Sequence, residues 1–487
     1  MTMYKHLFFD DKYLLVKKNV KRSYGTPELC EDAIYCDDNV NTSYASPWVF
    51  KLDNGKYRML YYGPNIKVEY ASGVFSAISD DGIHFEPEDV TAVRTATNVH
   101  TKNQVFVTSG YVGEAACIFE DHITDNKAER YKMLVAHYHD DPPYVDGWIY
   151  TSPDLINWTR VQDVLWSTDG EPIVGVFYND VKKCWTITKR CVAGVRMIGF
   201  IETTDWRNFS DFQMCAHVDS LDGDLDEMYG MPAFAYDGWF IGFPFIYGDN
   251  KSGLISKYSG GTMKAQLSYS RDGRYWVRSL REPFVSGQAG DKSASDAFNA
   301  PMVWAMNMRI GEDDNIYIHA AATELEHGYA FHGVKHPAGR MFVYKLRRDG
   351  FIKLESADKE TESVIATREN ILHGGDVHFN LKAQKATVAV YEGLAYNPKG
   401  NVNSSTNCAL VEGFSHEDCI PFSGDSTDWV PEFKSGKKIS DMVGKTLIFE
   451  IKLEDGEIYS IYGDITPVFN VPAARYRINN EMPPFIL

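Results

Sequence analysis

The chain has 487 residues, enough for two or three domains and a large hydrophobic core. Aromatic residues make up 14% of it, with 29 Tyr, 27 Phe and 10 Trp, a mixture that favours β-strands and stacking surfaces. A formal net charge of −18 repels phosphate backbones and anionic lipid, which disfavours nucleic acid and membrane surfaces as partners. The sequence therefore predicts an all-β protein that binds neither.

Cysteine usage and the N-terminal residues narrow the chemistry and the compartment. The eight cysteines form no C-x-x-C pair and no Cys/His run at zinc spacing, so we expect buried thiols, no metal and no other cofactor. Residues 1–6 lack a charged region followed by an apolar run, and no stretch of about 18 apolar residues occurs. These features favour a cytoplasmic protein.

Residues 1–43 show little periodicity and contain the acidic pair Asp37-Asp38. We interpret them as an arm that wraps the first domain and contributes to its mouth. Apolar, β-prone segments bounded by turn signals then repeat along the chain. They fall into five groups, at residues 48–78, 116–151, 173–201, 232–269 and 302–345.

A recurring turn follows the last strand of the first four groups. Its frame is a hydroxyl residue, any residue, Asp, three residues and an aromatic residue, and the copies begin at positions 79, 152, 203 and 270. The Asp can accept bonds from backbone N–H groups, and the aromatic ring anchors the turn in an apolar layer. The spacing of 51 to 73 residues fits one four-stranded blade with its loops. The repeat predicts a five-bladed β-propeller, whose fifth turn keeps Asp349 but lacks the aromatic spacing.

The period changes after about residue 350. Residues 446–453 place Leu447, Phe449, Ile451 and Leu453 on one face, the alternation of a half-buried strand. Further strands are expected near 376–391, 406–412 and 458–462. We predict a five-bladed propeller with its arm over residues 1–350 and a β-sandwich with a C-terminal tail over 351–487.

The segment Ser152-Pro153-Asp154-Leu155-Ile156-Asn157-Trp158 resembles the S-x-D-L-x-x-W turn of the five-bladed propeller glycoside hydrolases of families 32, 43 and 68. A propeller followed by a β-sandwich is also similar to the layout of family 32 and of several family 43 enzymes. The resemblance implies a glycosidase that acts on an oligosaccharide or glycoside. One departure stands out: those families carry an Asp-Pro motif near the first strand, where this chain has Ala45-Ser46-Pro47.

Glycosidic cleavage uses two carboxyl groups across the scissile bond. In a propeller these groups must lie where the innermost strands open into the central funnel. Acids stand just before four such strands: Glu114, Glu171, Glu227 and Asp296. Glu171-Pro172 is similar to the segment that holds the general acid of families 32 and 43, which implies Glu171 as the proton donor.

The other acids receive different roles. Glu227 rivals Glu171 as the acid because the apolar residues beside it indicate burial. Glu114 stands where the resembled families place a transition-state stabiliser or an Asp that tunes the acid. Asp38 is the candidate base or nucleophile, with Asp37, Glu31 and Asp32 as alternatives.

Sugars are held by aromatic faces and by hydrogen-bonding side chains. The candidates on or near inner strands are Trp48, His137, Arg190, Tyr229 and His319. The His-rich segment 319–336 matches no zinc spacing, so we interpret it as a loop that lines the pocket.

Three functions are compatible with these features. The first is a glycoside hydrolase with two funnel carboxylates. The second is a carbohydrate-binding propeller without catalysis, favoured by the missing Asp-Pro motif. The third is a glycoside phosphorylase, in which Arg190, Lys189 and the histidines would hold phosphate. The sugar, its linkage and self-association into a homo-oligomer are left open.

Overall fold

The structure is a computed structural model. It describes residues 4–40, 45–64, 72–108, 113–140, 143–167, 174–224, 226–248, 261–285, 302–323, 339–393 and 408–468. Within these ranges the regular elements are β-strands and the short 3-10 helices Glu31–Ala33, Lys127–Glu129 and Ile439–Met442, with no α-helix. No helix among the described residues is long and apolar enough to cross a membrane. The all-β prediction is confirmed.

The chain forms two compact units. One comprises Thr26–Arg347 and is called the propeller unit; the other combines Met1–Gly25 with Arg348–Leu487 and is called the sandwich unit. The sequence predicts that residues 1–43 form an arm on the propeller, and the structure differs for the first 25 of them. Up to Gly25 they belong with the C-terminal part, because strands β1, β2 and β3 pair there.

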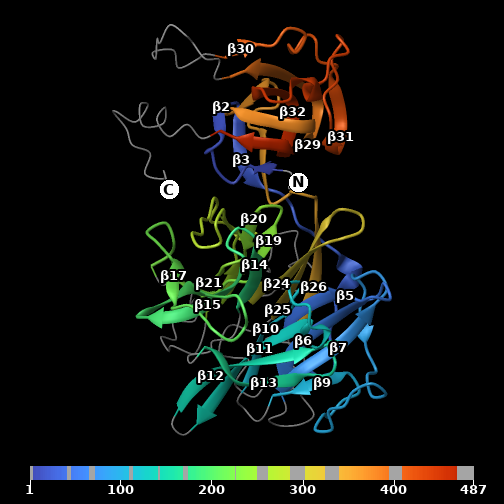
Figure 1. Cartoon of the computed structure of the whole chain (residues 1–487), viewed down its shortest axis with the longest axis vertical. Coiled ribbons are helices and arrows are strands. Elements are labelled where there is room, and N and C mark those ends of the chain that lie inside the picture. Colours follow the sequence, from blue (N-terminus) through green and yellow to red (C-terminus); the bar gives the residue numbers. More distant parts are fainter. Residues whose placement is uncertain are drawn as a thin grey trace. The chain divides into compact units, whose positions relative to one another are not determined.

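Three sheets of the propeller unit follow the first three predicted groups (Figure 1). Each begins with an inner strand and continues through antiparallel neighbours. The strands are β5 (Ser46–Lys51), β6 (Tyr57–Pro64), β7 (Ser72–Ser79), β8 (Glu86–Pro87) and β9 (Gln104–Val107); β10 (Gly113–Glu120), β11 (Tyr131–Asp140), β12 (Pro143–Ser152) and β13 (Thr159–Ser167); and β14 (Gly175–Asn179), β15 (Cys184–Ala193), β16 (Val195–Thr203) and β17 (Gln213–Ala216).

The remaining strands of this unit form a propeller-like arrangement without five separate four-stranded sheets. One sheet of seven strands runs in the order β18-β21-β22-β24-β25-β26-β4, and a sheet of three strands has the order β19-β20-β23. Strand β4 (Glu28–Leu29) pairs with β26 (Gly339–Leu346), so residues that precede the first sheet complete the last one. The five blades therefore stay a prediction. The other strands are β18 (Glu227–Gly230), β19 (Ala233–Tyr236), β20 (Trp239–Gly242), β21 (Phe245–Gly248), β22 (Thr262–Ala265), β23 (Ser268–Ser270), β24 (Met302–Ile310) and β25 (Ile316–Thr323).

The four predicted turns share one hydrogen-bond pattern. Asp272 Oδ1 accepts the backbone N–H groups of Arg274 at 2.8 Å and Tyr275 at 2.9 Å, and the hydroxyl of Ser270 at 3.0 Å. Asp81, Asp154 and Asp205 accept the equivalent backbone bonds. Because neighbouring strands alternate in direction, each turn lies at the end of its sheet opposite to the start of the inner strand.

The sandwich unit is a sheet of nine strands in which β29 (Asn370–Glu392) and β32 (Thr446–Pro467) pair along most of their length. The predicted alternation is confirmed: Leu447, Phe449, Ile451 and Leu453 are all fully buried. The other strands are β1 (Tyr4–Leu7), β2 (Leu14–Lys18), β3 (Val20–Tyr24), β27 (Ile352–Ser356), β28 (Ser363–Thr367), β30 (Ala409–Leu410) and β31 (Phe422–Trp429).

Candidate functional site

Glu227 begins strand β18, the position expected for an acid at the start of an inner strand. Its Oε1 accepts the backbone N–H of Arg196 at 3.0 Å, and its Oε2 forms an ion pair with the Arg196 guanidinium. Arg196 belongs to β16, so the carboxylate is held from the neighbouring sheet. The Arg196 side chain is 11% exposed and the Glu227 side chain is 21% exposed. A fixed charged pair therefore stands at the start of β18.

Aromatic rings and a second guanidinium surround this pair. Tyr229 is buried two positions along β18, where the register with β21 shifts. The Cζ of Arg190 lies 4.3 Å from the centre of the Tyr229 ring, and the Cζ of Arg196 lies 5.5 Å from it. Tyr247, opposite Glu227 in the strand register, has its ring centre 5.8 Å from that of Tyr229. The structure thus brings together three predicted residues, Glu227, Arg190 and Tyr229, which with Arg196 and Tyr247 we call the entrance cluster.

The entrance cluster contains groups that can bind a saccharide. Guanidinium groups donate hydrogen bonds to hydroxyl or anionic oxygens, and tyrosine faces stack on the C–H faces of sugar rings. Among the described residues, no group of three or more His, Cys, Asp or Glu side chains could hold a metal ion. The cluster therefore offers a carboxylate, two cations and two aromatic rings as its working groups.

His137 lies in another stack, in the second sheet. Its ring stacks on Trp148 with centres 3.7 Å apart, and the Arg160 guanidinium lies 3.8 Å from the centre of the Trp148 ring. His139 packs edge-on against His137 and contacts the Asp146 carboxylate at 3.0 Å. Burial, and then the nearby His139, lower the pKa of His137 below its ordinary value. A lowered pKa favours the neutral imidazole, which can accept as well as donate a hydrogen bond.

The side chains of Asp37 and Asp38 lie in different environments. Asp38, the predicted base or nucleophile, is exposed, whereas Asp37 is 1% exposed. Asp37 accepts the Tyr61 hydroxyl at 2.5 Å and the Asn103 side-chain amide at 2.8 Å. Burial raises the pKa of Tyr61, so the phenol stays protonated as a donor. Trp48, in β5, is 2% exposed and belongs to the core.

His319 lies in the middle of β25, opposite Asn307 and Val343. It is 1% exposed and its Nε2 accepts the Arg309 Nε–H at 3.3 Å. Arg309 also donates to the carbonyl of Gly82 in the first turn, and the ring of Phe85 packs edge-on against His319. Burial, and then the charge of Arg309, lower the pKa of His319 well below its ordinary value. These contacts place the residue in the packing between two sheets.

Three of the predicted acids have no described side chain. Glu171 and Asp296 lie outside the described residues, as does the His-rich segment from residue 324 onward. Glu114 lies in β10, where only its backbone is described, opposite Ala136. Their catalytic roles stay predictions.

Sequence reasoning missed Arg196 and Tyr247. Arg196 follows Gly194, whose φ of 87° marks the hairpin between β15 and β16. A basic residue just after such a hairpin was the available signal, because these hairpins lie at the same end as the inner-strand starts. Tyr247 carries no such signal, since its place opposite Glu227 depends on strand pairing.

No protein-family model matches this chain, and no curated protein matches its sequence. Solved structures with a similar arrangement include the Bombyx mori GH32 β-fructofuranosidase, at 12% identity and a TM-score of 0.41, covering 89% of this chain and 95% of that one. The Schwanniomyces occidentalis β-fructofuranosidase has 10% identity and a TM-score of 0.41, covering 91% and 98%. An N-acetylgalactosamine deacetylase from F. plautii has 13% identity and a TM-score of 0.40, covering 67% and 95%. Likeness at this level identifies neither a family nor an activity.

Proposed function

We propose that the chain is a glycoside hydrolase that cleaves its substrate with two carboxylates at the inner-strand starts of a five-bladed propeller. One observation carries the proposal: Glu227 stands at the start of β18, fixed by Arg196, whose guanidinium also lies over the ring of Tyr229. A carboxylate, cations and aromatic faces in one cluster are the groups that glycosidic cleavage and sugar binding require.

The contacts of Glu227 favour a role as the charged carboxylate. Its two oxygens are both engaged by Arg196, so proton donation would first require breaking the ion pair. A fixed anion can instead stabilise the positive charge that develops on the sugar ring in the transition state. The proton donor is then Glu171, as the resemblance to families 32 and 43 implies. Glu114 and Asp296 remain further acids of the same funnel.

A phosphorylase is the second candidate, and the two guanidinium groups around Tyr229 favour it. Arg190 and Arg196 both lie against this ring, from adjacent strands of one sheet. Arginine binds phosphate through parallel N–H bonds, so the pair could position phosphate in place of the attacking water. The hydrolase remains the main proposal because Arg196 is already paired with Glu227.

A panel of aryl glycosides, assayed with and without inorganic phosphate, tests both functions. Removing a general acid, or a charge that stabilises the transition state, costs about 10²-fold or more in rate. We expect Glu227→Gln and Glu171→Gln each to lower kcat at least about 100-fold. Glu202→Gln is the matched control, because Glu202 is also an acid paired with an arginine, Arg274, at 2.7 Å but at the turn end of the third sheet.

The outcomes separate the candidates. Turnover that requires phosphate would identify a phosphorylase. Saccharide binding without turnover on any glycoside would identify a non-catalytic binding propeller. Full activity in both Glu227→Gln and Glu171→Gln would overturn the assignment of the carboxylates.

A further inference from the structure

The outer strand of the first sheet differs from those of the second and third sheets. β13 and β17 each run as one strand, whereas here the outer position is shared by β8 and β9, with residues 88–103 between them. β8 ends opposite Ala77 and β9 begins opposite Phe75, so the register skips Ser76. The N–H of Ser76 donates to the Asn103 carbonyl at 2.7 Å, and its carbonyl accepts the Glu88 N–H at 3.1 Å. Residues 88–103 are thus an insertion whose two ends meet at one residue.

The insertion is held in a defined conformation. Arg94 Nη1 donates to the carbonyls of Thr101 at 2.9 Å and Gln104 at 2.7 Å, which ties the loop together from inside. Asn157, in the second turn, accepts the N–H and the hydroxyl of Thr95, both at 2.8 Å. Irregular connections longer than ~12–15 residues are uncommon in compact domains and usually serve a function. A long insertion fixed in this way indicates a binding surface.

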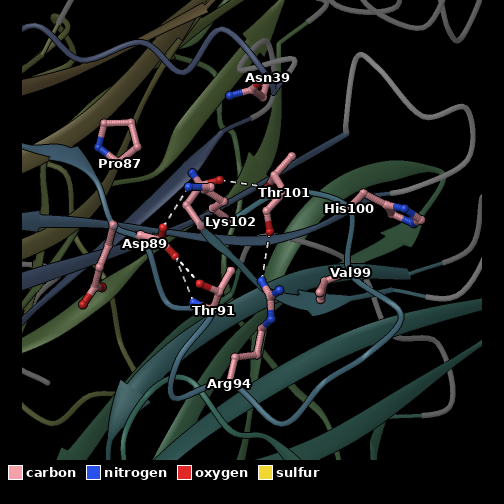
Figure 2. A pocket seen from close by; sticks show the side chains of 11 residues that line it. Asn39, Pro87, Asp89, Thr91, Arg94, Val99, His100, Thr101 and Lys102 are labelled. Atoms are coloured by element: carbon pink, nitrogen blue, oxygen red, sulfur yellow. Dashed lines mark hydrogen bonds and ion pairs between the residues drawn. The ribbon is translucent and has the colours of Figure 1, made fainter.

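The insertion surrounds a pocket of about 560 Å³ (Figure 2). This volume lies within the ~300–1,000 Å³ typical of small-ligand sites. Asn39 lies on one side of the pocket and Arg94 on the opposite side, with Thr101 and Lys102 between them (Figure 2). None of its lining residues belongs to the entrance cluster.

A buried carboxylate fixes two amides of the pocket wall. Asp37 accepts the side-chain amide of Asn39 at 3.1 Å and that of Asn103 at 2.8 Å. Asp37 is 1% exposed, and its partners among the described residues are the neutral groups of Tyr61, Asn39 and Asn103. Burying a carboxylate without a cation costs free energy. Fixing the wall of a binding site before the ligand arrives is a use that offsets this cost.

The carboxylates that line the pocket are paired with cations. Its lining carries two carboxylates, Glu88 and Asp89, and two cations, Arg94 and Lys102. Asp89 accepts the Thr91 hydroxyl at 2.6 Å and contacts Lys102 Nζ at 3.2 Å. Glu88 is paired at 2.7 Å with Arg58, which lies outside the lining, and Arg94 donates to two backbone carbonyls. With these groups already bonded, the described lining presents no cluster of free charge of one sign to select an anion or a metal ion. The lining instead suits a neutral ligand that offers donors and acceptors together.

Hydroxyl groups on a saccharide offer this combination, since each one both donates and accepts. Charged side chains, amides and the hydroxyl of Thr101 supply the complementary partners. Pro87 and Val99 add apolar surface for the C–H face of a sugar ring. We propose that this pocket, formed by the insertion at residues 88–103, binds a neutral oligosaccharide as a second saccharide site, independent of cleavage at the entrance cluster.

Hydrogen–deuterium exchange on the full chain tests the proposal. The probes are gluco-, galacto-, manno-, xylo- and fructo-oligosaccharides of about two to four units, and oligogalacturonate as the acidic comparison. We expect at least one neutral oligosaccharide to slow exchange of the amides of residues 88–103, both in the natural chain and in Glu227→Gln. The double variant His100→Ala/Lys102→Ala should weaken this binding about tenfold or more, which corresponds to the loss of one or two hydrogen bonds.

Two exposed residues of the sandwich unit provide the control, His373→Ala/Lys359→Ala, which should bind as the natural chain does. Protection confined to residues 226–230, with none at 88–103 for any neutral probe, would overturn the second site. Protection of 88–103 by oligogalacturonate alone would overturn the neutral ligand. Neither result depends on the aryl-glycoside assay, so this proposal and the proposed hydrolase fail independently.

Discussion

Arg196 engages both oxygens of Glu227, one through its backbone N–H and the other through its guanidinium. The contact joins β16 of the third sheet to β18 of the next, at the end of the unit where inner strands begin. It therefore fixes the strand that carries the acid as well as the acid itself.

Arg196→Met tests the structural share of this contact. The variant leaves a mostly buried carboxylate with a single hydrogen bond, so we expect a loss of about 1–3 kcal/mol in the free energy of unfolding. Arg274→Met is the control, because the Arg274 side chain is 38% exposed in its pair with Glu202 and should cost under about 1 kcal/mol. Urea unfolding followed by tryptophan fluorescence measures both. Equal losses would show that the Arg196 pair does not hold the strand.

Asp37 and Asp38 are adjacent in sequence but opposite in environment, which makes them a matched pair. Asp37→Asn puts an amide where the Tyr61 hydroxyl and the Asn103 amide donate, so we expect a loss of about 2–3 kcal/mol in stability. Asp38→Asn changes an exposed side chain and should stay within about 0.5 kcal/mol. Thermal unfolding and aryl-glycoside turnover should be measured together. A stable but inactive Asp38→Asn would support Asp38 as the base or nucleophile, and full activity would remove it.

The turn carboxylates predict how stability depends on acid. The N–H of Asn208, then its side-chain amide and the N–H of Arg207, lower the pKa of Asp205 to about 2 in the folded chain, from 3.8. A pKa lowered by folding contributes stability above the unfolded value, and this contribution is lost as the pH falls through the folded value. We expect the free energy of unfolding to fall between about pH 4 and pH 2, and less steeply in Asp205→Asn.

Asp211→Asn, an exposed acid in the same connection, is the control for this titration. Its pH profile should follow that of the natural chain. Identical profiles for Asp205→Asn and the natural chain would show that the turn bonds do not persist in solution.

Local signals made part of the fold predictable. The turn frame depends on residues at most six positions apart. The hydrogen bond between Ser270 and Asp272 can therefore be predicted from the local sequence alone. The apolar alternation of residues 447–453 likewise predicts which of these side chains are buried. The N-terminal strands carry no such signal, because Tyr4 pairs opposite Gly463 and only the tertiary structure brings these residues together.

The same distinction applies to the site. The acid at the start of β18 was predictable from its position before an apolar strand, whereas its partner Arg196 comes from another sheet. Sequence could not decide between Asp37 and Asp38, because a single step along the chain reverses which side chain points inward. The insertion at residues 88–103 escaped notice because its polar composition is that of an ordinary loop.

The last prediction concerns the N-terminal strands of the sandwich unit. Lys5 in β1 contacts Asp349 Oδ1 at 2.8 Å, and Ser460 in β32 donates to Asp349 Oδ2 at 2.6 Å. The side chains of Lys5 and Asp349 are 9% and 1% exposed, so Lys5→Met removes one cation from a buried carboxylate and leaves Arg348, whose Nε lies 3.7 Å from Asp349 Oδ1. Because Arg348 and Ser460 still contact Asp349, we expect a loss of about 1–3 kcal/mol in the stability of this unit. Lys18→Met, at an exposed position of β2, is the control.

Limited proteolysis read by mass spectrometry distinguishes the two units. In Lys5→Met, and more strongly in a chain that lacks residues 1–25, cleavage should appear first within residues 348–468, because three strands are weakened or lost from that sheet. Residues 26–347 should keep the resistance of the natural chain, since they form a compact unit of their own. If residues 348–468 stay resistant after removal of 1–25, strands β1 to β3 are dispensable additions to a sandwich that folds without them.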